Sequence, residues 1–180
     1  MKPIITTLND IRVHEPYASG WAKLLSSLGK TKADDEPVAL TTILESNGIT
    51  DAIRCLRAVE GHDREIRLFA VACARHVQHL TTDPRSHAAL DVAERYATGE
   101  ATSAELAVAR TAAWAAARAA ARDTAWDAAW DAAFAAAFAA AWAAAGGAAW
   151  DAAWAAEREW QAQKFIEIFG GNDGTDHHHS

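Results

Sequence analysis

The sequence predicts an all-α fold, a multi-helix bundle with long alanine- and tryptophan-rich C-terminal helices built on a four-residue repeat. Apolar residues recur at the spacing of one helix face in the N-terminal half. Alanine, the strongest helix former, fills the C-terminal half, and no proline follows Pro84. We expect a single domain over residues 1–170. Its parts are an N-terminal extension with the first helix (1–37), a helical block (38–100) and the repeat helices (101–169), and a disordered tail (171–180), native or partly a purification tag, follows.

Proline, glycine and capping residues mark the expected helix ends before residue 62. Residues 1–14 are irregular or hold one short strand. Pro16 is expected as the first residue of a helix that ends at Gly29. The elements expected after it are a charged linker (30–37), a short helix from Val38 that ends at Asn47–Gly48, and a second helix capped by Thr50 that ends at Gly61.

The clearest periodicity in this half follows residue 62. Apolar residues at the i, i+3, i+4, i+7 spacing predict the central, buried helix, and these are Ile66, Phe69, Ala70, Cys73, Val77 and Leu80. Asp83 as N-cap and Pro84 as first residue predict the next helix, which ends at Gly99. Thr102 and Glu105 have the spacing of a capping box, which begins the alanine-rich half.

A four-residue repeat runs through the alanine-rich half. Every fourth residue is aromatic, arginine or glycine, namely Arg110, Trp114, Arg118, Arg122, Trp126, Trp130, Phe134, Phe138, Trp142, Gly146, Trp150, Trp154 and Arg158. The helix propensity of alanine predicts helices over residues 103–145 and 148 to about 168, with a break at Gly146–Gly147.

The repeat does not match the helical turn. A step of four residues advances the aromatic position by about 40° on a helix with 3.6 residues per turn, so the aromatic stripe spirals around the helix. Either several helices wrap around it, or the tract is cut into pieces of about five repeats. We expect most of the Trp and Phe side chains to form the core between flat alanine faces, and the alternative is that some line a ligand surface.

Aspartates follow the aromatic positions. Asp123, Asp127 and Asp131 are spaced four residues apart, where like charges repel by a few tenths of a kcal/mol per pair. The compensating charge is either internal or an external cation or basic partner. The arginines available for internal pairing are Arg110, Arg118, Arg122 and Arg158.

Composition argues against several classes of protein. The net charge of −7 disfavours general nucleic-acid binding, which requires a basic face. The N-terminus lacks the pattern of a signal peptide, and charged residues recur in every 20-residue window of the alanine-rich half except 132–150, which contains Gly146 and Gly147. Cys55 and Cys73 are expected as buried, reduced thiols, so we expect a cytoplasmic protein without a membrane span.

The sequence predicts neither an enzyme nor a cofactor or metal site. Nucleophile-elbow, phosphate-loop, zinc-protease and dinucleotide patterns are absent from it. Cys73, His76 and His79 are of zinc-binding types but fan across the helix, so a core cysteine with surface histidines is expected. His62, Asp63 and Arg67 form a polar turn, which is either a helix cap or part of a site.

The block from Cys55 to Thr102, followed by the tail from Thr111 to Ala133, resembles bacterial and phage proteins described as immunity proteins. The resemblance covers about residues 38–165, and it lies in the combination of a helical block with an Ala/Trp/Asp-rich tail. It implies an all-helical protein that neutralises a cognate toxin by binding, and it implies no catalytic residues.

The first functional hypothesis is therefore occlusion of a protein toxin by an acidic and aromatic surface. The alternative is sequestration of a small planar ligand, such as a nucleotide signal or an aromatic antibiotic, by stacking and cation–π contact. A purely structural protein is the third hypothesis, and two copies could pair through alanine faces. The candidate binding residues are His62, Asp63, Arg67, Arg118, Arg122, Trp126, Asp127, Trp130, Asp131, Trp150, Asp151 and Trp154.

Overall fold

The computed structural model describes residues 2–122, 124–144 and 147–171. Asp123, Gly146 and most of the C-terminal tail lie outside the described residues. Within them the chain forms ten α-helices and one two-stranded sheet, which confirms the all-α multi-helix bundle. The helices before residue 100 are α1 (Leu8–Val13), α2 (Ala18–Ser27), α3 (Leu40–Asn47), α4 (Ile49–Cys55), α5 (Asp63–His76) and α6 (Pro84–Thr98). The later helices are α7 (Ser103–Ala112), α8 (Ala115–Ala120), α9 (Ala125–Ala143) and α10 (Gly147–Phe169).

The N-terminal segment pairs with a strand that precedes α3 and also contacts the end of α10. β1 (Ile5–Thr7) pairs antiparallel with β2 (Pro37–Ala39), with Ile5 opposite Ala39. The backbone N–H of Ile4 donates to the carbonyl of Phe169 at 2.9 Å, so the end of α10 closes against the first strand. Residues 1–14, expected to be irregular or to hold one short strand, contain the strand β1, but they also contain helix α1, which was not expected. Val38, expected to begin a helix, instead lies in β2, because pairing with β1 holds it extended.

Two other helix starts also differ from the sequence expectation. Helix α2 begins at Ala18, after Pro16 and an extended Tyr17. Gly48, at a φ of +89°, separates α3 from α4 directly, so α4 begins at Ile49 and Thr50 lies inside it. A positive φ costs glycine little, and the two helices can therefore meet without a linker.

Helix α5 is the central helix, as the periodicity predicts. Ile66, Phe69, Ala70 and Cys73 are buried along it. The predicted helix is too long, however, because α5 ends at His76, and Leu80, expected on the buried face, is 40% exposed in the turn that follows. The ring of Phe69 meets Phe165 of α10 edge-on, with the centroids 5.6 Å apart. The caps of the following helices are also confirmed, because Asp83 accepts the Arg85 N–H and Thr102 forms a reciprocal capping box with Glu105.

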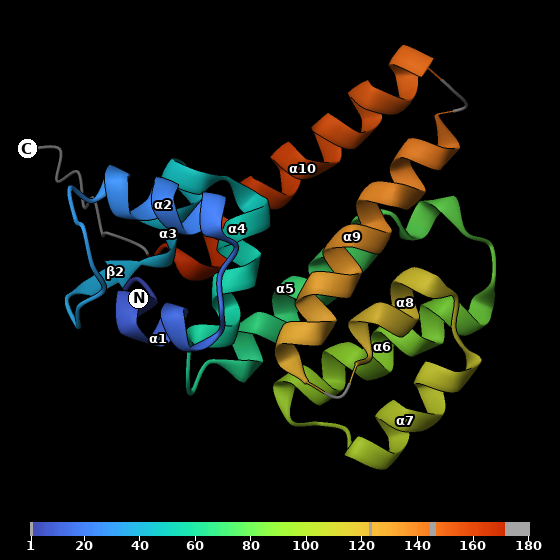
Figure 1. The fold of residues 1–180 in the computed structure, drawn as a ribbon. Helices are drawn as coiled ribbons and strands as arrows, with labels where there is room; N and C mark the ends of the chain where they lie inside the picture. Colours follow the sequence, from blue (N-terminus) through green and yellow to red (C-terminus); the bar gives the residue numbers. More distant parts are fainter. Residues whose placement is uncertain (1, 123, 145–146, 172–180) are drawn as a thin grey trace, which may run out of the picture.

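The expected helix over 103–145 is wrong, because the tract folds into three helices. The chain is extended at Ala113 and Trp114, where the Trp114 N–H donates to Ser86 Oγ at 3.2 Å. Thr124 then caps α9 by accepting the Asp127 N–H. Because of these breaks, α8 and α9 fold back and pack against α5. One long, straight helix could not bury its surface against α5 in this way. Figure 1 shows α9 beside α5 and α8, with α10 returning toward α3 and α4.

The expectation that most tract aromatics form the core is also wrong among the described residues. Alanines of α9 are buried instead, at Ala125, Ala128, Ala129, Ala132, Ala133, Ala136, Ala137 and Ala141. The aromatic residues of α9 are at least partly exposed, and Trp142 is 71% exposed. Helices α5 and α9 approach closely because alanine is small, and a ring does not fit between them.

The aromatic residues of the repeat nevertheless spiral around α9, as expected. This helix carries five aromatic positions, from Trp126 to Trp142, which is one of the two arrangements expected from the repeat. Four steps of about 40° sweep the stripe through roughly half the circumference. The N-terminal rings therefore face α4, and the C-terminal rings face α10 and a groove beside α6 and α8.

Candidate ligand-binding cavity

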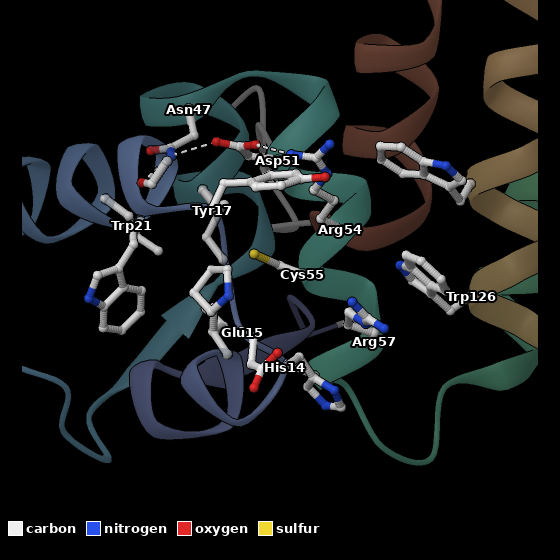
Figure 2. A pocket seen from close by; sticks show the side chains of 17 residues that line it. His14, Glu15, Tyr17, Trp21, Asn47, Asp51, Arg54, Cys55, Arg57 and Trp126 are labelled. Atoms are coloured by element: carbon white, nitrogen blue, oxygen red, sulfur yellow. Dashed lines mark hydrogen bonds and ion pairs between the residues drawn. The ribbon is translucent and has the colours of Figure 1, made fainter.

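A cavity of about 320 Å³ lies between the segment that enters α2, helix α4 and the first turns of α9. Figure 2 shows its side chains converging from these segments, which are distant in the sequence. Four aromatic residues contribute to the wall, namely Tyr17, Trp21, Trp126 and Trp130. Arg54 and Arg57 reach it from α4 and the turn that follows. The cavity is thus lined by π surfaces and guanidinium groups.

The two arginines lie against the aromatic rings. The guanidinium carbon of Arg54 is 4.0 Å from the ring centroid of Tyr17 and 4.9 Å from that of Trp130. The guanidinium carbon of Arg57 is 4.3 Å from the ring centroid of Trp126. Each such contact contributes about 0.5–1 kcal/mol at a partly exposed site. In these contacts the guanidinium groups and the aromatic rings lie one on another. A planar ligand can stack on the same surfaces as a further layer.

Hydrogen bonds orient the aromatic wall. The indole Nε1–H of Trp126 donates to the carbonyl of Ile53 at 3.1 Å, which ties α9 to α4. The rings of Trp126 and Trp130 lie 19° from parallel, with centroids 6.0 Å apart. Because the Trp126 ring is held by the backbone of a neighbouring helix, it needs little reorganisation to receive a ligand.

A polar cluster closes the α2 side of the cavity. Asn47 Nδ2 donates to Asp51 Oδ2 at 2.9 Å and to the carbonyl of Gly20 at 2.8 Å. Asp51 also lies 3.7 Å from Arg54 (Figure 2). A Cβ atom on Gly20 would stand 2.5 Å from Asp51 Oδ2, so glycine is what allows α2 to approach this carboxylate.

Cys55 is the thiol at the cavity wall. It is buried and free, and desolvation by burial, with a smaller effect of Asp51, raises its pKa to about 12. The thiol therefore stays protonated at neutral pH and acts as a small apolar group rather than as a nucleophile.

Trp126 and Trp130 are the two predicted binding residues that line this cavity. The neighbouring aspartates have other partners. Asp127 caps α9 together with Thr124, since Thr124 Oγ1 donates to Asp127 Oδ2 at 2.6 Å. Asp131 pairs with Arg122 at 2.8 Å between Oδ2 and Nε. Charge compensation for Asp131 is thus internal, and Asp127 is stabilised at a helix N-terminus.

The predicted residues of α10 belong to a second set of contacts. Trp154 meets Phe134 at 5.6 Å between centroids, and Trp150 meets Phe138 at 5.5 Å. These edge-on pairs join α9 to α10, and Asp151 beside them is exposed. An open apolar groove of about 1140 Å³ adjoins this contact, and its aromatic residues are Trp114, Phe134, Phe138 and Trp142.

The remaining predicted residues support the fold elsewhere. Arg67 is buried and donates to the carbonyl of Arg122 at 2.9 Å, and Arg118 donates to the carbonyl of Ala113 at 3.0 Å. His62 lies 3.5 Å from Glu65, and Asp63 begins α5, as in the helix-cap interpretation. None of these four lines the cavity.

Sequence reasoning missed most of the cavity. The missed residues are Tyr17, Trp21, Asn47, Asp51, Arg54 and Arg57. Arg54 and Arg57 are three residues apart, which predicts a shared helix face but not a partner on α9. No local signal in the sequence connects them with Trp126.

The zinc-type residues of α5 and of the turn that follows it do not converge in the structure. His76 Nδ1 lies 2.7 Å from Glu157, and His79 Nδ1 lies 3.1 Å from the carbonyl of His76. Burial raises the pKa of the Cys73 thiol far above its ordinary value. Within residues 2–122, 124–144 and 147–171, no group of three or more His, Cys, Asp or Glu side chains is placed to hold a metal ion.

The fold and the cavity define the class of protein, which is an all-α bundle with an aromatic cavity large enough for a small ligand. In the described part of the chain, none of the helices combines the length and apolar character that crossing a bilayer requires. Comparisons with protein-family models, curated proteins and solved structures give no match. We therefore infer function from the cavity and its chemistry.

Proposed function

We propose that this protein binds and sequesters a small planar ligand in the cavity between α2, α4 and α9. The observation that carries the proposal is the set of aromatic rings with two arginines held against them, Arg54 on Tyr17 and Trp130 and Arg57 on Trp126. Stacking and cation–π contact bind flat molecules, and the volume of about 320 Å³ is in the range of small-molecule pockets.

In this proposal the protein binds its ligand without catalysing a reaction, and it acts in the cytoplasm. The Cys55 thiol at the cavity wall is kept protonated, so it does not supply a nucleophile. Cys55 and Cys73 are both free and buried, which suits a compartment that keeps thiols reduced. A ligand held by pre-positioned rings is removed from solution, and this removal is the proposed activity.

Tryptophan fluorescence and calorimetry test the proposal directly. A panel of nucleotides, nucleosides and planar drugs is titrated into the full chain and into Trp126→Ala. We expect saturable binding by the wild type and at least tenfold weaker binding by Trp126→Ala, because the ring under Arg57 is lost. Trp142→Ala is the matched control, since Trp142 belongs to the same repeat and lines the other groove. Equal loss in both variants would contradict the proposed site.

A second candidate function is neutralisation of a protein toxin by occlusion, as the resemblance to immunity proteins implies. It is supported by the exposed aromatic groove, where Trp114, Phe138 and Trp142 are each more than half exposed. Exposed aromatic clusters are typical of protein interfaces. Asp127 and Asp131 have partners within the chain, so toxin binding at this groove would rely on aromatic contacts. Asp151 is the exposed carboxylate available to a basic partner.

Growth rescue separates the two functions. Cells that express a toxin encoded beside this gene are supplied with the wild type, with Trp142→Ala or with Trp126→Ala. Occlusion through the groove predicts that Trp142→Ala loses rescue while Trp126→Ala keeps it. Rescue that survives Trp142→Ala would contradict this second candidate.

A further inference from the structure

We infer that the ligand of this cavity is a planar aromatic anion, a single ring system that carries a phosphate or carboxylate group. The inference rests on the proposed function and adds the chemical class of the ligand. The inference depends on the charged side chains at the cavity. Some of them already form an ion pair within the protein, and others do not.

The acid on the α4 side of the cavity is partnered within the protein. Asp51 accepts a hydrogen bond from Asn47 at 2.9 Å and lies 3.7 Å from Arg54. Arg54 in turn is held between the rings of Tyr17 and Trp130. This group is therefore close to neutral, and it offers little attraction to a cationic ligand.

The surroundings of Arg57 differ from those of Arg54. Its guanidinium lies over the ring of Trp126, its side chain is exposed, and within the described ranges no carboxylate lies within 4.0 Å of it. Figure 2 shows the side chains of Arg57 and Trp126 next to each other on the α9 side of the cavity, with His14 and Glu15, which follow α1, at its lower edge. Among the described residues, the α9 side of the cavity thus carries a positive charge without an acidic partner.

The geometry of Arg57 suits an anion attached to a ring. A guanidinium presents its N–H donors in the plane of the group, in a fork that matches the oxygens of phosphate and carboxylate. With one face of Arg57 on Trp126, the donors at its edge remain available to an oxyanion. A ligand ring stacked on the aromatic wall would place a short anionic substituent at that edge.

The cavity also limits what can bind. A volume of about 320 Å³ is near the lower end of the roughly 300–1,000 Å³ found for small-molecule pockets, which favours one ring system with a short substituent. A planar cation would be repelled by the Arg57 guanidinium and, among the described residues, would gain no free carboxylate on the side of Trp126. The class is therefore a nucleotide-like or aromatic-acid ligand rather than a cationic aromatic drug.

Paired probes that differ in charge test the inference. Adenosine is compared with adenosine monophosphate, naphthalenemethanol with naphthoate, and proflavine serves as the planar cation, all by quenching of the eight tryptophans in the full chain. We expect at least one anion to bind on the order of tenfold more tightly than its neutral partner, and proflavine to bind most weakly. The phosphate and carboxylate pairs show which oxyanion is preferred.

Substitution of the cation supplies the second part of the test. Arg57→Gln should weaken binding of the anion by about tenfold more than binding of its neutral partner, so that the preference for the anion is lost, and Arg57→Lys should retain part of the preference. Arg64→Gln is the control, because it removes the same charge from an exposed arginine of α5 outside the cavity. Added salt should reduce the preference in the wild type and not in Arg57→Gln.

The outcomes separate this inference from the proposed function. Equal binding of neutral and anionic partners, or an anion preference that survives Arg57→Gln, overturns the inference and leaves planar-ligand binding in place. Tightest binding of proflavine overturns it as well. Absence of binding by every neutral, anionic and cationic probe overturns the inference together with the proposed function.

Discussion

His76 Nδ1 lies 2.7 Å from Glu157 Oε2, and this contact joins the central helix α5 to α10. Glu157 is buried, and its other oxygen accepts a hydrogen bond from Gln161 at 3.0 Å. The imidazole of His76 also stacks on Trp160, with the ring centroids 3.8 Å apart. The buried carboxylate thus depends on a histidine that is itself held by an aromatic ring.

Removal of that histidine should destabilise the fold. We expect His76→Ala to lower the free energy of unfolding by about 2 kcal/mol, because a buried carboxylate loses a hydrogen-bond partner. Urea unfolding followed by circular dichroism measures the change. His79→Ala is the control, since His79 is exposed and bonds a backbone carbonyl, and it should cost under about 0.5 kcal/mol. Equal losses in the two variants would contradict the role given to His76.

The alanine interface between α5 and α9 leads to a second prediction. Ala132 is fully buried, so Ala132→Leu should overpack the contact and destabilise the protein by about 1–3 kcal/mol. Ala155→Leu makes the same change at an exposed position of α10 and should alter stability by less than about 0.5 kcal/mol. The midpoint of thermal unfolding compares the two, and a stable Ala132→Leu would show that α9 does not pack closely through its alanines.

Gly20 gives a prediction that separates stability from binding. In Gly20→Ala the new Cβ displaces the Asp51 carboxylate, while the gain in helix propensity is about 1 kcal/mol. We therefore expect unfolding stability to change by less than about 1 kcal/mol and ligand affinity to fall, because Asn47 and Arg54 lose their orienting partner. Calorimetry with the ligand from the panel measures the affinity.

A double variant controls for other effects of the Gly20 substitution. If Asp51 is the group displaced, then adding Gly20→Ala to Asp51→Ala should change affinity no further. Losses that add in the double variant would mean that Gly20 acts through another contact.

Asp83 provides the prediction about pH. Hydrogen bonds from the Arg85 side chain, and then from its backbone N–H, lower the pKa of Asp83 from 3.8 to about 2. A carboxyl whose pKa is lowered by folding stabilises the folded state above its unfolded pKa, and this contribution disappears as the pH falls through the folded value. The stabilisation should therefore be complete above pH 3.8 and lost near pH 2.

Asp83→Ser tests this dependence, because serine keeps an N-cap acceptor without the charge. Thermal unfolding of both proteins across the acid range should show the wild type more stable above pH 3.8 and no difference near pH 2. A difference that stays constant over this range would contradict the assignment.

Features that depend on a few neighbouring residues could be predicted from the sequence alone. Asp83 with Pro84, and Thr102 with Glu105, are caps that form within three residues, so their patterns are sufficient to predict them. The class of fold follows from periodicity and alanine content. The spiral of the aromatic stripe in α9 follows from the mismatch between a four-residue repeat and the helical turn.

The tertiary structure decided which faces are buried and which residues meet. Alanine predicts helix at every position from 103 onward, and the breaks arise because folding α8 and α9 back buries more surface than one long helix could. The same close approach excludes the rings from the core. Trp126 bonds to Ile53 across 73 residues of sequence, so the cavity exists only once α9 packs on α4. Contacts of that range depend on the whole packing arrangement, which local patterns do not encode.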